Sequence, residues 1–335
     1  MSSLRTVSRL VLAGASALCC VLAPVVGLAQ SSSPPRLQLK QHFQAHQLQG
    51  ESLIQVGFAP SSRHFFTVAS DGIAKIWTSP DQLVMQFSQN PPAMFFNARL
   101  EADNATLVTA AYNGLANLWS THGSAPRSFS PHFSGVTDIA ILPDAHGLIT
   151  TSDDGFIRFW SIDGRLLKRI PQPGVSRHLS VAPHRQLVAV TQDIGSVAVL
   201  TTTGRFLQSF ATAQGRLNDV IFSPDERMLI TAGFDGTIKI WQIDASNTPP
   251  LLKRTIPAQL GSGWVEGLAI NQSGLLASVS DDGILRLWSA EGELLSSLKL
   301  SHGHLLSVSF SPDGHGLLAA AQDGTVSSIE LIQPR

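Results

Sequence analysis

Cysteine is almost absent from this chain, and that absence excludes several kinds of site. The 335 residues include two cysteines, Cys19 and Cys20, and both lie within the first 20 positions. The rest of the chain therefore has no disulfide, no thiolate metal site and no cysteine nucleophile. If the N-terminal segment is removed, an apolar core alone must hold the protein together.

Charge of either sign is also sparse. Charged residues make up 14% of the chain and hydrophobic residues 43%, and the formal net charge is -1. This balance is typical of a compact protein and argues against disorder. Basic residues form no run interleaved with aromatic side chains, so we expect no nucleic-acid binding. No glycine-rich segment precedes a lysine and a helix, which excludes a phosphate-binding loop of that type.

The first thirty residues have the layout of an export signal. Arg5 and Arg9 give a short basic start, and an uncharged stretch follows over residues 10–23. Small residues then occur in Gly27-Leu28-Ala29, just before Gln30. A basic start, an apolar middle and small residues at the cut are the three parts of a secretory signal peptide.

We therefore predict a signal peptide over residues 1–29, a linker over 30–35 and a protein exported to the periplasm or secreted. After cleavage we expect no contact with a membrane. The alternative is a membrane-anchored protein, because the uncleaved stretch 10–29 is about long enough to span a bilayer.

A repeat of about 41 residues runs through the rest of the chain. A glycine that follows Asp or an equivalent residue recurs seven times, at Gly72, Gly114, Gly155, Gly195, Gly236, Gly283 and Gly324. Five positions after these glycines stand Trp77, Trp119, Trp160, Leu200, Trp241, Trp288 and Ile329. Five of the six tryptophans thus occupy one offset, which identifies an internal repeat.

Each repeat reads as several short strands. Between Gly236 and Trp241, the apolar residues Ile238 and Ile240 flank Lys239, and an alternation of period two is typical of a strand. The tryptophan points away from the apolar pair, so both faces of the strand require burial. The Asp-Gly dipeptides before these strands favour tight hairpins. Four antiparallel strands per repeat suggest one propeller blade per repeat.

The fifth repeat carries the most specific pattern. It reads Phe222-Ser223-Pro224-Asp225, then Leu229-Ile230-Thr231-Ala232, then Asp235-Gly236-Thr237-Ile238-Lys239-Ile240-Trp241. It resembles the WD-repeat family, although the Asp that follows the tryptophan in that family is replaced throughout. The resemblance implies an all-β fold, a seven-bladed β-propeller of four-stranded antiparallel blades over residues 36–332. It also implies that an N-terminal strand over Leu37 to Phe43 joins the last blade and closes the ring.

The resemblance further implies a buried, hydrogen-bonded set of His, Ser or Thr, Asp and Trp within a blade. By sequence only the third repeat matches fully, with His132, Ser152, Asp154 and Trp160. The same structural role is expected of Trp77, Trp119, Trp241 and Trp288. A Ser, a His and an Asp can also form a catalytic triad. Their repeat positions favour the structural role, so we expect no enzyme and no cofactor.

A histidine-rich patch raises the question of a metal site. His302, His304 and His315 lie close together in the sequence. Zinc needs three or four convergent ligands, and the sequence offers no further partner near these residues. We therefore expect no metal at this patch.

Loops rather than blades are expected to carry function. In the family, the usual docking face holds the hairpins between the second and third strands and the connections between blades. Tyr112 and Phe234 lie at such hairpins, and Phe133, Arg216 and Trp264 lie in such connections. Aromatic and arginine side chains often anchor interfaces. We therefore predict a non-catalytic scaffold that binds protein partners through this face.

The alternative function is an enzyme or small-ligand binder that uses the central channel. Such a site needs convergent polar groups at the inner strands. The inner-strand residues considered are apolar, namely Val220, Phe222, Leu268, Ile270, Val308 and Phe310. This composition favours the scaffold.

Overall fold

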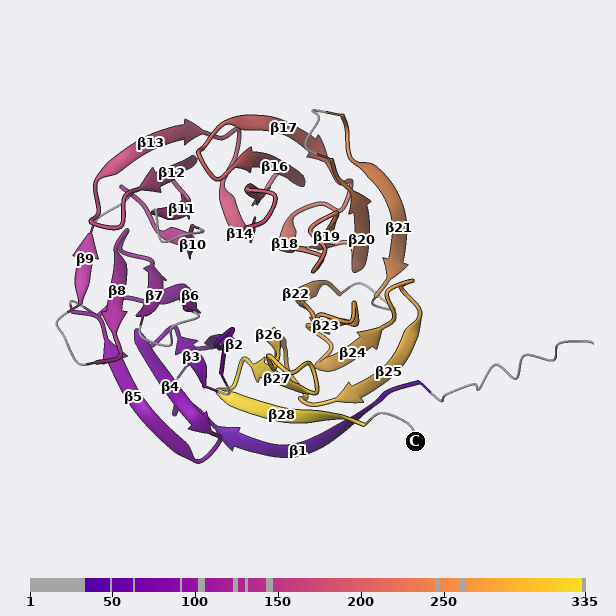
Figure 1. Cartoon of the computed structure of the whole chain (residues 1–335). Coiled ribbons are helices and arrows are strands. Elements are labelled where there is room, and N and C mark those ends of the chain that lie inside the picture. The colour runs from indigo at the N-terminus through magenta and orange to yellow at the C-terminus, as the bar shows by residue number, and fades with distance from the viewer. Residues whose placement is uncertain are drawn as a thin grey trace, which may run out of the picture. The chain divides into compact units, whose positions relative to one another are not determined.

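The chain forms a ring of β-sheets. The computed structural model describes residues 34–48, 50–62, 64–90, 92–101, 106–122, 126–129, 132–142, 147–244, 248–258 and 263–332. Every regular element within these ranges is a β-strand. The strands make seven four-stranded antiparallel sheets arranged around an axis, which confirms the predicted seven-bladed propeller (Figure 1). The predicted signal peptide over 1–29, and residues 30–33 of the linker, lie outside the described residues.

Each blade runs outward from an inner strand near the axis (Figure 1). The first blade contains β2 (Leu53–Phe58), β3 (Phe65–Ala69), β4 (Ile73–Ser79) and β5 (Gln82–Ser88). The second contains β6 (Phe95–Leu100), β7 (Thr106–Ala111), β8 (Ala116–Ser120) and β9 (Arg127–Phe129). The third contains β10 (Val136–Ile141), β11 (Leu148–Ser152), β12 (Phe156–Trp160) and β13 (Leu166–Pro171). The fourth contains β14 (Ser176–Ala182), β15 (Leu187–Gln192), β16 (Ser196–Thr201) and β17 (Phe206–Ala211).

The remaining blades follow the same order. The fifth contains β18 (Leu217–Phe222), β19 (Met228–Gly233), β20 (Thr237–Gln242) and β21 (Leu251–Pro257). The sixth contains β22 (Val265–Ile270), β23 (Leu276–Ser280), β24 (Ile284–Trp288) and β25 (Leu294–Lys299). The seventh contains β26 (Leu305–Phe310), β27 (Gly316–Ala321), β28 (Thr325–Ile332) and the N-terminal strand β1 (Arg36–Gln44).

Strand β1 closes the ring. It pairs antiparallel with β28, from Arg36 opposite Ile332 to Gln44 opposite Thr325. In Figure 1 the indigo β1 lies directly outside the yellow β28. The predicted closure by an N-terminal strand is therefore confirmed. It covers the edge of β28, which would otherwise be open to pairing with another chain.

The repeat glycines make the hairpins between the second and third strands possible. All seven have positive φ angles, for example 77° at Gly72 and 71° at Gly283, a region that glycine enters without steric cost. The preceding aspartates add a local bond: the Asp71 carboxylate accepts a hydrogen bond of 2.8 Å from the Ile73 N–H. The Asp-Gly dipeptides thus set the turns, as their sequence indicates.

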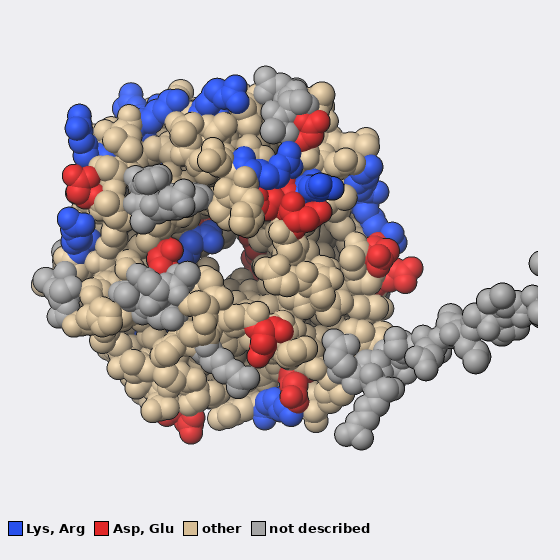
Figure 2. Space-filling view, in the orientation of Figure 1, with Lys and Arg blue, Asp and Glu red and all other residues tan. Residues whose placement is uncertain are grey.

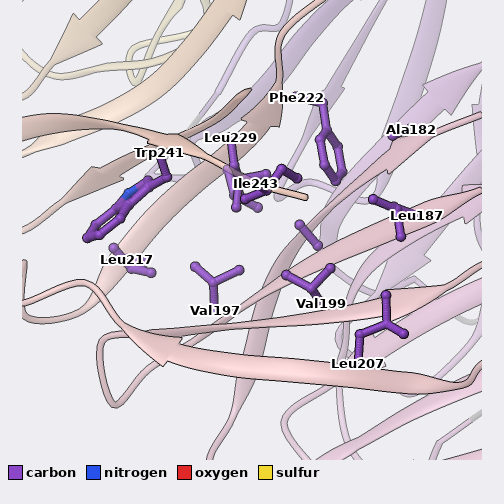
Figure 3. Close-up of a cluster of buried hydrophobic side chains, with 12 residues drawn as sticks. Ala182, Leu187, Val197, Val199, Leu207, Leu217, Phe222, Leu229, Trp241 and Ile243 are labelled. Carbon is purple, nitrogen blue, oxygen red and sulfur yellow. The ribbon is translucent and has the colours of Figure 1, made fainter. Parts of the chain in front are cut away.

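The core consists of apolar layers between neighbouring blades. Figure 3 shows the layer between the fourth and fifth blades, where Val197 and Val199 of β16 and Trp241 of β20 belong to one buried cluster. The same arrangement recurs around the ring: Val326 of the last blade shares a cluster with Trp77 of the first. Both faces of the third strand in each blade are therefore buried, as the alternating pattern predicts.

The charged residues show no large region of one sign on the face seen in Figure 2, where Lys and Arg are interspersed with Asp and Glu. The same view shows an opening at the centre of the ring. Among the described residues, no helix is long and apolar enough to cross a membrane.

Candidate protein-interaction face

Three of the five predicted docking residues meet in one stack. Arg216 precedes β18, Phe234 lies in the β19–β20 hairpin, and Trp264 precedes β22. The Arg216 guanidinium lies 5.0 Å from the centre of the Phe234 ring. Phe234 stacks on Trp264 with ring centres 5.1 Å apart and 14° between the planes. His304, before β26, contacts Trp264 edge-on at 6.1 Å. We call these four residues the aromatic stack.

Hydrogen bonds hold the aromatic stack in place. The Phe234 N–H donates to the Arg216 carbonyl at 3.0 Å, and the Trp264 N–H donates to the Asp281 carboxylate at 3.3 Å. The Trp264 indole N–H donates to the Glu266 carboxylate. Burial raises the pKa of Glu266, although the indole bond opposes the shift. The Phe234 side chain is exposed, so a preorganised ring faces solvent.

The other two predicted residues lie apart from the aromatic stack. Tyr112, in the β7–β8 hairpin, contacts Phe96 edge-on with ring centres 5.8 Å apart. Its backbone N–H donates to the Met94 carbonyl in the connection before β6. Phe133 is 98% exposed, with no ring contact to the described residues. Tyr112 and Phe133 therefore offer a second apolar position near the second and third blades.

Sequence reasoning missed two of the aromatic partners. His304 was considered only as a metal ligand, and Phe96 was not considered at all. His304 contacts Trp264 from a neighbouring blade, and Phe96 of β6 contacts Tyr112 within the second blade. No group of three or more His, Cys, Asp or Glu side chains suited to a metal ion occurs within the described ranges.

The buried polar set of the third blade differs from the prediction in one member. His132 contacts Asp154 at 3.0 Å through Nδ1, but its Nε2 contacts the hydroxyl of Thr150 at 2.8 Å. The Trp160 indole N–H donates to the same hydroxyl at 2.9 Å. Ser152 instead accepts a hydrogen bond from the Asp154 N–H. The proposed role of Ser152 in this set is therefore wrong, because the indole reaches diagonally across the strand pair to Thr150.

The first blade holds a second complete set, which the sequence analysis did not find. His46 contacts Asp71 at 3.1 Å and the Thr67 hydroxyl at 3.0 Å, and the Trp77 indole N–H donates to Thr67 at 3.0 Å. The prediction that only the third repeat matches fully is therefore wrong. His46 lies before β2 as His132 lies before β10, and in both sets the bonded hydroxyl is the one ten residues before the tryptophan.

Neither histidine set has the geometry of a catalytic triad. The hydroxyl of Ser152 contacts the backbone of its own turn rather than His132. The Thr150 hydroxyl is fully buried and lies between His132 and the Trp160 indole. Burial lowers the pKa of His132 to about 4, and nearby Arg158 acts in the same direction while Asp154 opposes it. His132 and Thr150 are buried, and their hydrogen bonds stabilise the blade interior.

The channel-facing side chains are more polar than expected. The third residue of each inner strand lines the channel: Gln55, Asn97, Asp138, His178, Asp219, Gly267 and Ser307. Asp138 accepts a hydrogen bond from the Leu179 N–H and Asp219 from the Leu268 N–H, both at 2.8 Å. These bonds join neighbouring inner strands. The prediction of a mainly apolar channel is therefore wrong. It rested on alternate residues of these strands, and several of those side chains point into the blade cores.

Comparison with known proteins agrees with this architecture. The WD domain, G-beta repeat family matches the chain over residues 37–78, 123–161, 204–242, 252–289 and 292–328. The chain belongs to the WD-repeat family. This WD-repeat protein is 41% identical over 306 residues to an uncharacterized WD repeat-containing protein of Synechocystis sp., with 91% of this chain and 90% of the relative covered.

Two further relatives extend the comparison. A second WD repeat-containing protein of Synechocystis sp. is 32% identical over 307 residues, again with 91% of this chain and 90% of the relative covered. Transducin beta-like protein 2 of Mus musculus is 23% identical over 292 residues, which is 83% of this WD-repeat protein and 59% of the mouse protein. Proteins of the family generally act as scaffolds for protein interactions.

Proposed function

We propose that this WD-repeat protein is an exported, non-catalytic scaffold that binds a protein partner through the aromatic stack. The observation that carries the proposal is the contact of Arg216, Phe234 and Trp264, which come from three separate loops and form one partly exposed surface. Stacked aromatic and arginine side chains held rigid before binding are typical of the energetic centre of an interface.

Export is the second part of the proposal. It is supported by the basic, apolar and small-residue segments within residues 1–29. The partner is then a periplasmic or secreted protein. A chain still anchored by an uncleaved N-terminal segment is the alternative, and it leaves the docking face unchanged.

Affinity capture from the exported fraction of source cells tests both parts. We expect Phe234→Ala with Trp264→Ala to lower partner recovery at least tenfold, since loss of interface anchors of about 2 kcal/mol each has that effect. The matched control is Phe206→Ala with Leu294→Ala, which removes two exposed apolar side chains from the outer strands β17 and β25. Equal recovery with the stack variant and the wild type would exclude the aromatic stack as the docking site.

The mass of the N-terminal peptide of the captured bait reports its processing. A bait that begins at Gln30 supports cleavage and export. A bait that retains residues 1–29 and sediments with membranes supports the anchored alternative.

A further inference from the structure

A cavity of about 360 Å³ lies between the fifth and sixth blades. Its lining comes from the β18–β19, β22–β23 and β24–β25 turns and from the strands that these turns join. Arg216 of the aromatic stack precedes β18, whereas Phe222 ends this strand, so the cavity opens on the face opposite the docking face. We call it the inter-blade cavity.

The walls of the inter-blade cavity are apolar. Ile230 and Leu276 are buried, with 3% and 2% of their surface exposed, and Ile240 and Ile270 are partly buried. All four belong to the apolar layer between the fifth and sixth blades, and Met228 completes the wall. Sites for small molecules usually measure about 300–1,000 Å³ and are lined mainly by apolar side chains. The inter-blade cavity meets both conditions.

Smaller side chains than those of the neighbouring boundary account for the open space. Between the fourth and fifth blades, Phe222 at the end of the inner strand and Ile243, two positions after the repeat tryptophan, are both buried (Figure 3). The sixth blade has Ile270 and Ala290 at these two positions, and both line the cavity. Protein interiors are normally close-packed, so atoms missing from a layer leave space that a ligand can fill.

The strand register supports this correspondence between the two blades. Phe222 is opposite Leu229 in the fifth blade, and Ile270 is opposite Leu276 in the sixth. Each of these leucines is in turn opposite the repeat tryptophan of its own blade. The cavity therefore occupies the place that the Phe222 and Ile243 side chains fill one boundary earlier in the ring.

The charge of the lining disfavours an anionic ligand. Asp225 is the only charged residue among the described residues that line the cavity. Its carboxylate accepts hydrogen bonds from the Ser223 hydroxyl at 2.5 Å and from the Arg227 N–H at 3.1 Å. The bond from Ser223 holds the pKa of Asp225 below its usual range, so this group stays negative. An anion in the cavity would lose its hydration without gaining a counter-ion.

A cation gains little in the same place. Asp225 is exposed, so water and salt screen its attraction for a positive charge. The other polar lining residues are neutral, and Gln272 and Ser289 carry an amide and a hydroxyl that can bond a single polar group. An apolar cavity of about 150 Å³ holds benzene, so the inter-blade cavity has room for about two or three aromatic rings.

We propose that the inter-blade cavity binds an uncharged, apolar small molecule of the size of two or three aromatic rings. The site is separate from the aromatic stack, because it lies at the other end of the strands and shares no residue with it. The ligand and the protein partner therefore occupy opposite faces of the ring.

Fluorescence titration of the purified protein with two matched probes tests the proposal. N-Phenyl-1-naphthylamine is neutral, and 8-anilino-1-naphthalenesulfonate has the same three rings with an added sulfonate. We expect the neutral probe to bind saturably at a single site, about tenfold or more tighter than the sulfonate, because burial of the charge is unfavourable. Equal or tighter binding of the sulfonate would contradict an uncharged ligand.

Variants that fill the cavity locate the site. Ile270→Phe with Ala290→Ile gives the sixth blade the side chains of the fifth, and we expect at least about a tenfold loss of affinity for the neutral probe. The thermal midpoint should stay unchanged or rise, because added apolar contacts fill a void. Val84→Phe, at an exposed position on β5, is the matched control and should leave the affinity unchanged.

The single variant Ala290→Ile keeps the test decisive if the double variant fails to fold. Ala290 is exposed, so its enlargement narrows the cavity without disturbing a packed layer, and it should also weaken binding. No saturable binding of the neutral probe, or equal affinity in the wild type and the filled variants, would overturn the proposal. Loss of probe binding in Phe234→Ala with Trp264→Ala instead would also overturn it, because the probe would then bind the docking face.

Discussion

Each repeat tryptophan is tied to a hydroxyl ten residues earlier in the chain. The hydrogen-bonded pairs are Thr67 with Trp77, Thr109 with Trp119, Thr150 with Trp160, Thr231 with Trp241 and Ser278 with Trp288, all at 2.9–3.0 Å. Where Leu200 and Ile329 replace the tryptophan, the apolar residues Val190 and Ala319 replace the hydroxyl. A buried indole N–H requires an acceptor, so the two positions depend on each other.

This dependence gives a prediction for the third blade. Thr150→Val removes the acceptor of both Trp160 and His132, and should lower the free energy of unfolding by about 1–3 kcal/mol. Ser152→Ala removes one hydrogen bond to a turn and should cost about 1 kcal/mol or less. Urea denaturation of both variants measures the difference. A larger loss for Ser152→Ala would contradict the observed network.

The buried His132 predicts a pH dependence of stability. Its pKa is about 4 in the folded protein, below the ordinary value of 6.5, so the unfolded chain binds its proton first as the pH falls. Neutral His132 therefore contributes its full stabilisation above pH ~6.5. As the pH falls from ~6.5 to ~4, the free energy of unfolding should decrease by about 3 kcal/mol.

The matched control for this prediction is His132→Gln. Glutamine occupies the corresponding place in the fifth blade, where Gln214 accepts a hydrogen bond from the Thr231 hydroxyl. Urea denaturation at several pH values should show a weaker decline for His132→Gln than for the wild type over this window. Parallel declines would show that another group causes the acid sensitivity.

At the scale of strands and turns, much of the structure can be predicted from the sequence. The Asp-Gly dipeptides predict the hairpins, and the period-two alternation predicts the third strand of each blade. The fourth blade forms with Leu200 in place of tryptophan, because Leu200 is fully buried in the same position against Ile157 and Phe159 of the third blade. A repeat therefore tolerates loss of its signature residue when another apolar side chain fills the layer.

The candidate sites were harder to predict, for a physical reason. Phe234 and Trp264 are 30 positions apart, and their contact depends on how two loops from different blades meet. The channel carboxylates were missed because the prediction rested on apolar inner-strand residues such as Val220 and left out Asp138 and Asp219, the third residues of β10 and β18. Local patterns specify a strand, whereas a surface shared by several blades depends on the relative placement of those strands.

At the scale of the whole molecule, the ring makes these sites possible. No blade buries both of its faces alone, and each apolar layer joins residues of two neighbours. The aromatic stack depends on loops of the fifth, sixth and seventh blades, and the channel is lined by inner strands from around the axis. Closure of the ring by β1 therefore stabilises the framework on which the proposed docking depends.

Deletion of β1 tests this account most directly. Phe43 of β1 contacts Phe65 and Trp77 of the first blade, with ring centres 6.0 and 5.5 Å apart, so β1 also joins the two ends of the ring. Thermal unfolding should be measured for a chain that begins at residue 45 and for one that begins at residue 36. We predict a single transition in both, with the midpoint lowered by about 10 °C or more in the shorter chain. An unchanged midpoint, or separate transitions for separate blades, would contradict a ring whose stability depends on closure.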